Sequence, residues 1–205
     1  MVEHIDIEWV EYRRQQQAVS NILRERSTEL FMQKRNIAIV KDVEGNEIVL
    51  IHDIRFRGKR YINWEDVEDY LRQYIGEFYQ IAESGDLIYI GKDLPDEYTN
   101  SEYTEQIRGG NAKAKANAAQ GIPEMLAIAT NKKYESNRKE KHRKDAAYGW
   151  YRYETRFALP VYEEKEIARY NVFHAVMLIR HDINGKLYLY DIVNIKKEPS
   201  TPPKH

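Results

Sequence analysis

The last third of the chain alternates apolar and polar residues in three runs, and this alternation predicts three antiparallel strands at about 150–161, 170–181 and 186–196. The last two runs are joined by a turn containing Asn184-Gly185, and this dipeptide is a strong hairpin signal. The run 186–196 carries apolar residues on both faces. We therefore expect it to be a central strand of the sheet.

The segment 64–83 has the clearest helical spacing of apolar residues. Asn63 is a suitable N-cap, and two acidic residues in the first turn suit the positive end of a helix. Ser84-Gly85 follows, and 87–90 predicts a short strand. The apolar stripe that predicts this helix consists of Trp64, Val67, Tyr70, Leu71, Tyr74, Ile75, Phe78 and Ile81.

The stretch 91–110 has a proline and two adjacent glycines, so we expect a long loop there. An alanine- and lysine-rich segment then predicts a helix at about 111–120. Gly121 and Pro123 interrupt this helix. Because proline suits the first turn of a helix, we expect a second helix at about 123–140.

The N-terminal part predicts a helix over 5–34 and then a β-hairpin over 36–54, with its turn at 44–46. Together these elements give an α+β fold, in which helices are followed by an antiparallel β-sheet. We expect three parts along the chain: an accessory helix and hairpin (1–62), the main α+β domain (63–198) and a frayed tail (199–205).

Composition narrows the class of protein. With 205 residues and 42% hydrophobic residues, the chain can build an ordinary core. No apolar run is long enough for a membrane span, and the N-terminus lacks the apolar core of a signal peptide. The chain has no cysteine, which excludes disulfides and zinc–thiolate sites. We expect a cytoplasmic protein of a bacterial host cell that does not bind membranes.

The net charge is only −1, but it is unevenly distributed. Residues 64–105 carry twelve acids and two bases, whereas residues 106–160 carry twelve bases and five acids. The second stretch therefore favours nucleic acid as a partner. Its densest part surrounds His142, which we expect to be a neutral general base because neighbouring cations disfavour a charged imidazole. The alternative is a solvated helix face with no ligand. This basic run consists of Lys132, Lys133, Arg138, Lys139, Lys141, Arg143 and Lys144.

The first predicted strand carries candidate chemistry. Arg152, Glu154 and Arg156 share one face with Trp150, whereas Tyr151, Tyr153, Thr155 and Phe157 share the other. Two arginines beside a carboxylate can hold a phosphate next to a general base. An equally ordinary interpretation is a ladder of surface ion pairs.

Other candidates are less specific. His174 and His181 are seven residues apart on one strand, so at most one of them faces the site. Lys113 and Lys115 lie near a helix N-terminus, which favours anions. Hydroxyl side chains occur just before, at Tyr98, Thr99, Ser101 and Tyr103.

We expect no metal and no cofactor, because no metal- or nucleotide-binding motif occurs. Three loop acids, Asp93, Asp96 and Glu97, could hold a divalent ion but are more typical of a solvated loop. A metal-dependent nuclease needs carboxylates on the strands near the basic run, and only Glu154 and Asp191 are suitably placed. We therefore do not expect a two-metal mechanism.

Four segments together resemble a known family: GEFYQIAESGDLIYIGKDLPDEYTNSEYT, AKAKANAAQGIPEML, GWYRYETRFALPV and LYLYDIVNIKKE. They resemble a domain of phages and conjugative elements, found in polyvalent proteins and at the C-termini of phage head-morphogenesis proteins of bacteria related to clostridia. The resemblance covers roughly residues 55–200. It implies the barnase/EndoU/colicin/RelE-like superfold, whose members are typically metal-independent ribonucleases. Positions that match its usual active residues are His142, Arg152, Glu154 and His174.

Three functions stay open. The first is a phage effector that cleaves or binds RNA through a basic His/Arg site. The second is a non-catalytic anti-defence protein, for example an anti-CRISPR inhibitor that binds a host nuclease or its guide RNA. The third is a virion-associated module. The partners we expect are RNA or a ribonucleoprotein, or a host defence protein. The residues predicted to contact nucleic acid are Lys113, Lys115, Lys139, Lys141, Arg143, Lys144 and Arg156.

Overall fold

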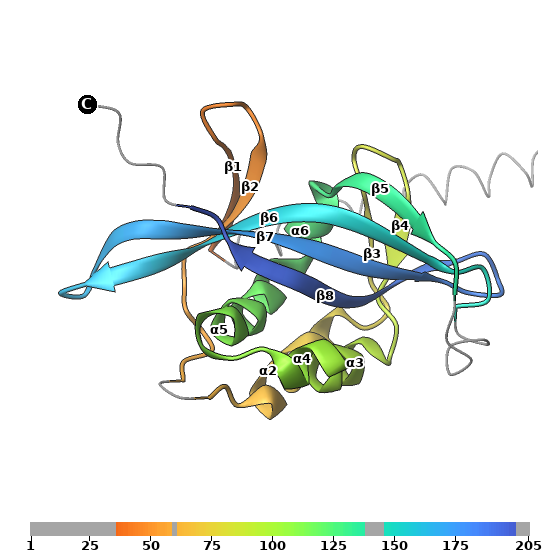
Figure 1. The fold of residues 1–205 in the computed structure, drawn as a ribbon, viewed down its shortest axis with the longest axis horizontal. Coiled ribbons are helices and arrows are strands. Elements are labelled where there is room, and N and C mark those ends of the chain that lie inside the picture. Colours follow the sequence, from red (N-terminus) through yellow and green to blue (C-terminus); the bar gives the residue numbers. More distant parts are fainter. Residues whose placement is uncertain (1–35, 59–60, 138–145, 200–205) are drawn as a thin grey trace, which may run out of the picture. The chain divides into compact units, whose positions relative to one another are not determined.

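A computed structural model of the chain describes residues 36–58, 61–137 and 146–199, and Figure 1 shows its fold. The described residues form an eight-stranded sheet in the order β1-β2-β6-β7-β8-β4-β3, with β5 paired to β6 beside this path. The fold class predicted from the sequence, α+β, is confirmed. The strands are β1 (Ile37–Lys41), β2 (Glu47–Ile51), β3 (Phe78–Gln80), β4 (Leu87–Tyr89), β5 (Thr130–Glu135), β6 (Trp150–Glu163), β7 (Glu166–His181) and β8 (Leu187–Lys197).

The three C-terminal strands form the longest part of the sheet, and the alternation of apolar and polar residues predicts all three. β6 and β7 pair antiparallel from Trp150↔Arg180 to Glu163↔Glu166, and β8 pairs antiparallel with β7. The end of β6 and the start of β7 project from the sheet as a long hairpin, hereafter the β6–β7 arm (Figure 1). Its turn residues Glu164 and Lys165 both have positive φ, as a two-residue hairpin turn requires.

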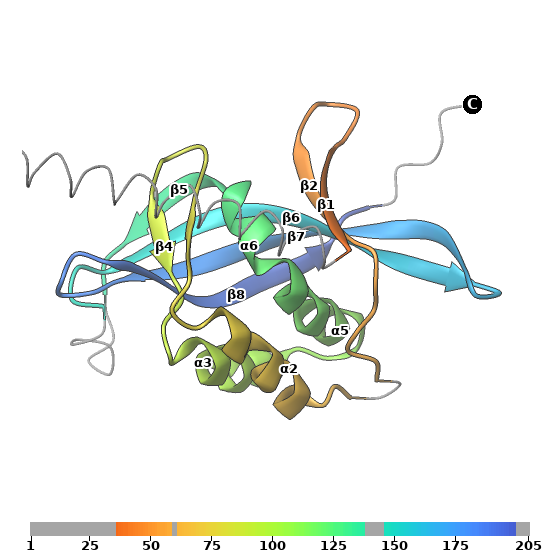
Figure 2. The same ribbon diagram turned by 180° about the vertical axis from the view of Figure 1, so that it is seen from behind.

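Helices gather along one side of the sheet in both views (Figures 1 and 2). Helices α3 and α5 pack on β8, and α6 packs on β6 and β2. Alternate strand residues face these helices, so Tyr153, Met177 and Ile192 are fully buried. The helices are α2 (Trp64–Leu71), α3 (Leu94–Asn100), α4 (Glu102–Gln106), α5 (Gly109–Ala118) and α6 (Ile122–Ala127), with 3₁₀ turns at Arg72–Tyr74 and Ala119–Gly121.

The helix predicted over 64–83 is shorter in the structure. It begins as expected, with the Asn63 side chain accepting a hydrogen bond from the Glu65 N–H. The α-helix ends at Leu71, and Gly76 then adopts a φ of +88°, which glycine accommodates without a Cβ clash. Phe78 starts β3 instead. Apolar residues on a short buried strand can continue a helical spacing by chance, which explains the error.

Two further predictions are wrong. The expected loop 91–110 contains α3 and α4, because Pro95 lies in the first turn of α3 and the Ser101 hydroxyl caps α4 through the Thr104 N–H. The helix expected over 123–140 ends at Ala127, and the chain continues as β5. Asn131 has a φ of +56° at the bulge where β5 begins to pair with β6.

The predicted hairpin at 36–54 is present as β1 and β2, and it belongs to the main sheet. β2 pairs parallel with β6 at Val49↔Phe157, and Val49 is fully buried. The described residues from Ala38 onward form one compact unit, which includes both sides of position 62. The predicted helix over 5–34 and the tail beyond 199 lie outside the described residues. No helix in the described part of the chain could span a membrane.

Candidate functional site

Three of the predicted site residues meet on the sheet face opposite the helices. Glu154 and Arg156 alternate with buried Tyr153, Thr155 and Phe157 along β6, so their side chains point to the more exposed face. Arg156 is the register partner of His174 on β7. The strand pairing thus brings residues eighteen or more positions apart into one cluster.

Glu154 is the centre of this cluster. Its Oε2 lies 3.7 Å from His174 Nε2 and accepts a hydrogen bond of 2.9 Å from the Asn131 amide. Its other oxygen accepts a hydrogen bond of 3.0 Å from Lys133. These bonds, that from Lys133 above all, lower the pKa of Glu154, so the group is an ionised carboxylate at neutral pH. About a third of its side chain is exposed to solvent.

Arg156 is held by two carboxylates. Its Nε and Nη2 atoms donate to the two oxygens of Glu198 at 2.8 Å each, and Nη1 donates to Asp42 at 2.6 Å. This guanidinium lowers the pKa of Glu198 and lowers that of Asp42 to about 2. The arrangement ties the β1–β2 turn and the end of β8 to β6, and it neutralises the arginine.

A cavity of about 480 Å³ opens beside this cluster, hereafter the hairpin recess. Its origin is the sheet topology: β2 and β5 pair along the same edge of β6, at Val49↔Phe157 and Thr130↔Glu154, and leave the edge between them unpaired. The β1–β2 turn and the first residues of β5 form its walls. Among the residues that line the recess are Lys41, Asn131, Glu154, Arg156 and His174.

Arg152 is near this recess but does not line it. Its Nε donates to Glu135 on β5 at 2.7 Å, two residues along β6 from Glu154. His181 lies apart from both, because its ring packs against Tyr148 and Tyr151. The structure therefore gathers three of the predicted residues, places Arg152 beside them and leaves His181 elsewhere.

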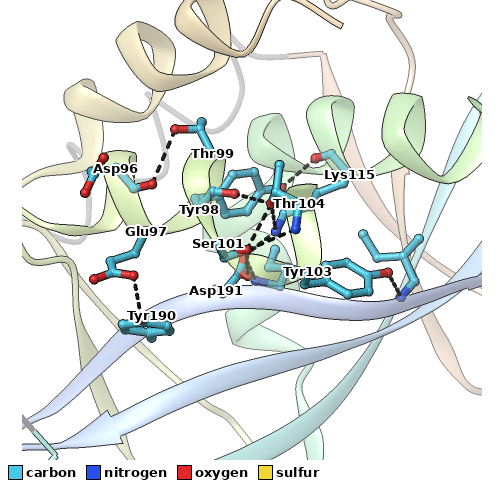
Figure 3. Close-up of polar contacts among 12 residues, drawn as sticks. Asp96, Glu97, Tyr98, Thr99, Ser101, Tyr103, Thr104, Lys115, Tyr190 and Asp191 are labelled. Carbon is cyan, nitrogen blue, oxygen red and sulfur yellow. Dashed lines mark hydrogen bonds and ion pairs between the residues drawn. The ribbon is translucent and has the colours of Figure 1, made fainter. Parts of the chain in front are cut away.

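Lys115 requires a correction, because it is not at the surface. The side chain is fully buried and its Nζ lies 2.5 Å from Asp191 Oδ1, which is also buried (Figure 3). The other Asp191 oxygen accepts a hydrogen bond from Ser101, and Lys115 also donates to Thr104. Burial raises the pKa of Asp191 and lowers that of Lys115. A fully enclosed ammonium cannot contact RNA at the surface, so Lys115 is a structural residue.

Three of the hydroxyl residues predicted on a loop, Tyr98, Ser101 and Tyr103, belong to this same cluster. Thr99 instead donates to the Pro95 carbonyl within α3. Tyr98 donates to the Lys115 carbonyl, and Tyr103 accepts a hydrogen bond from the Ile195 N–H. The rings of both tyrosines lie under the Lys115 ammonium, with Nζ-to-centroid distances of 4.6 and 5.0 Å. The cluster thereby fastens α3, α4 and α5 to β8.

The other residues predicted to contact nucleic acid fall into two groups, those that the structure describes and those that it does not. Lys113 is partly exposed and lines a different cavity, described below. Lys139, Lys141, His142, Arg143 and Lys144 lie outside the described residues. The predicted catalytic role of His142 therefore stays a prediction.

No three metal-binding side chains come together in the part of the chain that the structure describes. The three acids considered as ligands each have another partner: Asp93 pairs with Arg180, Asp96 with Asn100 and Glu97 with Tyr190. No local sequence pattern selects Asn131, Lys41, Asp42 or Glu198. Their relevance depends on a bulge and a hairpin docking that the local pattern does not encode.

Neither family models, nor curated proteins, nor solved structures yield a match to this chain.

Proposed function

We propose that the protein binds RNA and cleaves it without a metal ion at the hairpin recess. The observation that carries this proposal is the contact between an ionised carboxylate, Glu154, and an imidazole, His174, in a cavity that also holds Arg156. A base and an acid at this spacing can transfer two protons within one reaction. The resemblance of the sequence to a phage and conjugative-element domain with ribonuclease relatives agrees with it.

The reaction would be an internal transesterification. Glu154 takes the proton of the ribose 2′-hydroxyl, and the 2′-oxygen forms a bond to phosphorus. The bond from phosphorus to the 5′-oxygen breaks, and protonated His174 gives its proton to that oxygen. The products are a 2′,3′-cyclic phosphate and a 5′-hydroxyl end. Cations around the recess, among them Lys133 and Lys41, would stabilise the additional negative charge of the transition state.

Exposed aromatic side chains support RNA as the substrate. The rings of Tyr134 and Tyr151 are 5.5 Å apart between centroids, and His181 continues the row at 5.8 Å from Tyr151 and 5.2 Å from Tyr148. Tyr134 and Tyr148 are each more than half exposed. Such rings offer stacking surfaces for unpaired bases, so we expect single-stranded RNA to be preferred over duplex.

One observation favours a second candidate, a non-catalytic protein that binds a host defence enzyme. The cations on the candidate face are already paired: Arg152 with Glu135, Lys133 with Glu154, and Arg156 with Asp42 and Glu198. An RNA phosphate would have to compete with these carboxylates. A protein partner with complementary charges could instead exchange ion pairs with them.

The deciding experiment incubates the purified chain with total bacterial RNA and with a labelled single-stranded oligoribonucleotide, both in EDTA. Glu154→Gln and His174→Ala are compared with the matched control Glu135→Gln, which changes another β-strand glutamate of the same basic surface. Cleavage by wild type and control, with cyclic phosphate ends, and none by the two site variants would support the proposal. Intact RNA in all samples would reject cleavage and favour the binding protein, which a pull-down from a host lysate would then test.

A further inference from the structure

A second cavity, of about 810 Å³, is lined by the β6–β7 arm from its base to its turn, by the segment 54–58 and by Lys113 of α5. Figure 2 shows the arm extending past α5 on that side of the sheet. We call this cavity the arm groove. It shares no lining residue with the hairpin recess. Its volume falls within the range of pockets that hold small organic ligands.

The charged residues that line the arm groove are all basic. Arg57, Lys113 and Lys165 line it, and no acidic residue is among its lining in the described chain. The three cations come from three distant segments: the chain before α2, the middle of α5 and the turn of the arm. Such a one-signed lining attracts an anion and repels a cation.

Arg57 is available for a ligand. It pairs with Asp53 at 3.8 Å, but both side chains are more than half exposed, so the ion pair is weak. Arg57 Nε donates to the Ile54 carbonyl at 2.8 Å, which orients the guanidinium without neutralising it. This contrasts with Arg156 of the hairpin recess, which is held by two carboxylates.

The floor of the arm groove is apolar. Its apolar lining residues include Ile54, Leu159 and Phe173, and each of these side chains is at least nine-tenths buried. Tyr162 adds an aromatic ring that is 42% exposed and is oriented by a hydrogen bond from its hydroxyl to the His52 carbonyl. Asn171 adds an amide. A planar heterocycle fits such a surface, because it can stack on the ring and hydrogen-bond at its edge.

We infer that the arm groove binds a nucleoside phosphate, with the phosphate among Arg57, Lys113 and Lys165 and the base against Tyr162 and the apolar floor. Either a free nucleotide or the phosphorylated end of an RNA strand supplies this chemistry. The site is separate from the hairpin recess, so it does not depend on cleavage.

Calorimetric titration of the full chain tests this inference with AMP, UMP, inorganic phosphate and a tetranucleotide with or without a 5′-phosphate. We expect nucleotides to bind at least tenfold more tightly than inorganic phosphate. Lys113→Ala and Arg57→Ala should each weaken binding about tenfold, and Lys113→Arg should retain it. Lys186→Ala, a control of equal charge at the turn between β7 and β8, should bind as wild type does.

The outcomes separate cleanly. Preference for the 5′-phosphorylated tetranucleotide assigns the groove to RNA ends, and binding of the mononucleotides alone assigns it to free nucleotides; both support the inference. Equal binding of inorganic phosphate, or no heat from any nucleotide, would overturn it. Glu154→Gln should bind nucleotide normally, so loss of cleavage and loss of groove binding are independent results.

Discussion

Two ionic clusters lie on opposite faces of the same sheet, and they differ chiefly in their access to water. On the helix side, Lys115 and Asp191 are at most 1% exposed, and Ser101 and Thr104 complete their hydrogen bonds. On the other face, Glu154, Arg156 and His174 are 25–38% exposed and border a cavity. Pairs of acidic and basic side chains thus make a closed structural joint on one face and an open candidate site on the other.

The difference in solvent exposure determines which of the two clusters can bind a ligand. A buried ion pair whose hydrogen bonds are all satisfied cannot bind a further ligand. Removing either residue leaves the other charge buried without a partner and without water. Partly exposed groups lose little when a partner changes, because water replaces it. Stability and activity should therefore respond to mutation on different faces.

The largest expected effect is on stability, from Lys115→Met. This change leaves the Asp191 carboxylate buried without its cation, and we expect a loss of about 3–5 kcal/mol in the free energy of unfolding. Urea denaturation followed by circular dichroism measures it. The double variant Lys115→Met/Asp191→Leu should recover much of the loss, since it removes both charges. A loss below about 1 kcal/mol in the single variant would show that the Lys115–Asp191 pair does not stabilise the packing of the helices on β8.

The second effect is on activity alone. Glu154→Gln removes the proposed base, so cleavage of single-stranded RNA should fall by about 10²–10⁴-fold. Stability should change by less than about 1 kcal/mol because the group is partly exposed. Initial rates and urea denaturation are measured on the same samples. The control Glu135→Gln should leave the rate within about twofold, and an equal loss in both variants would contradict a specific role for Glu154.

The sequence predicts those features of the two faces that depend on local residue spacing and turn chemistry. The alternation of β6 places Glu154 and Arg156 on one face and Tyr153 and Phe157 on the other, and the structure confirms that division. The Asn-Gly hairpin and the three long strands are confirmed for the same reason: local spacing and turn chemistry determine them.

Tertiary placement is what the sequence did not reveal. Lys115 has the local context of a helix N-terminus, and only the packing of α5 on β8 shows that its side chain is buried against Asp191. Likewise, Arg156 pairs with Asp42 and Glu198, which are 114 and 42 residues away. Partners at such distances depend on the docking of whole elements, and one sequence does not encode them in any local pattern.

A third, smaller effect concerns the pH dependence of the open face. The hydrogen bond from Lys133 holds the pKa of Glu154 below its usual range. Lys133→Met removes that bond, so the pKa should rise and the acid limb of the pH–rate profile should move to higher pH. Carbon-13 chemical shifts of the Glu154 carboxyl follow the same titration without activity. An unchanged carboxyl titration would show that Lys133 does not control it.

The smallest effect concerns the carboxylates around Arg156. Their pKa values are lower in the folded state, that of Asp42 falling to about 2, so the stabilisation is present above the unfolded carboxyl pKa of about 4 and is lost as the pH falls toward 2. Arg156→Gln removes the cause, and stability should then decline less steeply between pH 4 and pH 2. Thermal unfolding across this range measures the slope.

The control for this last change is Arg152→Gln, which removes the same charge from the same strand but leaves Asp42 and Glu198 in contact with Arg156. It should keep the steep decline of the wild type. If both variants flatten the curve equally, net charge rather than the Arg156 contacts is responsible. If only Arg156→Gln does, the open face also contributes to stability, but through groups that solvent screens, in contrast to the buried pair on the helix side.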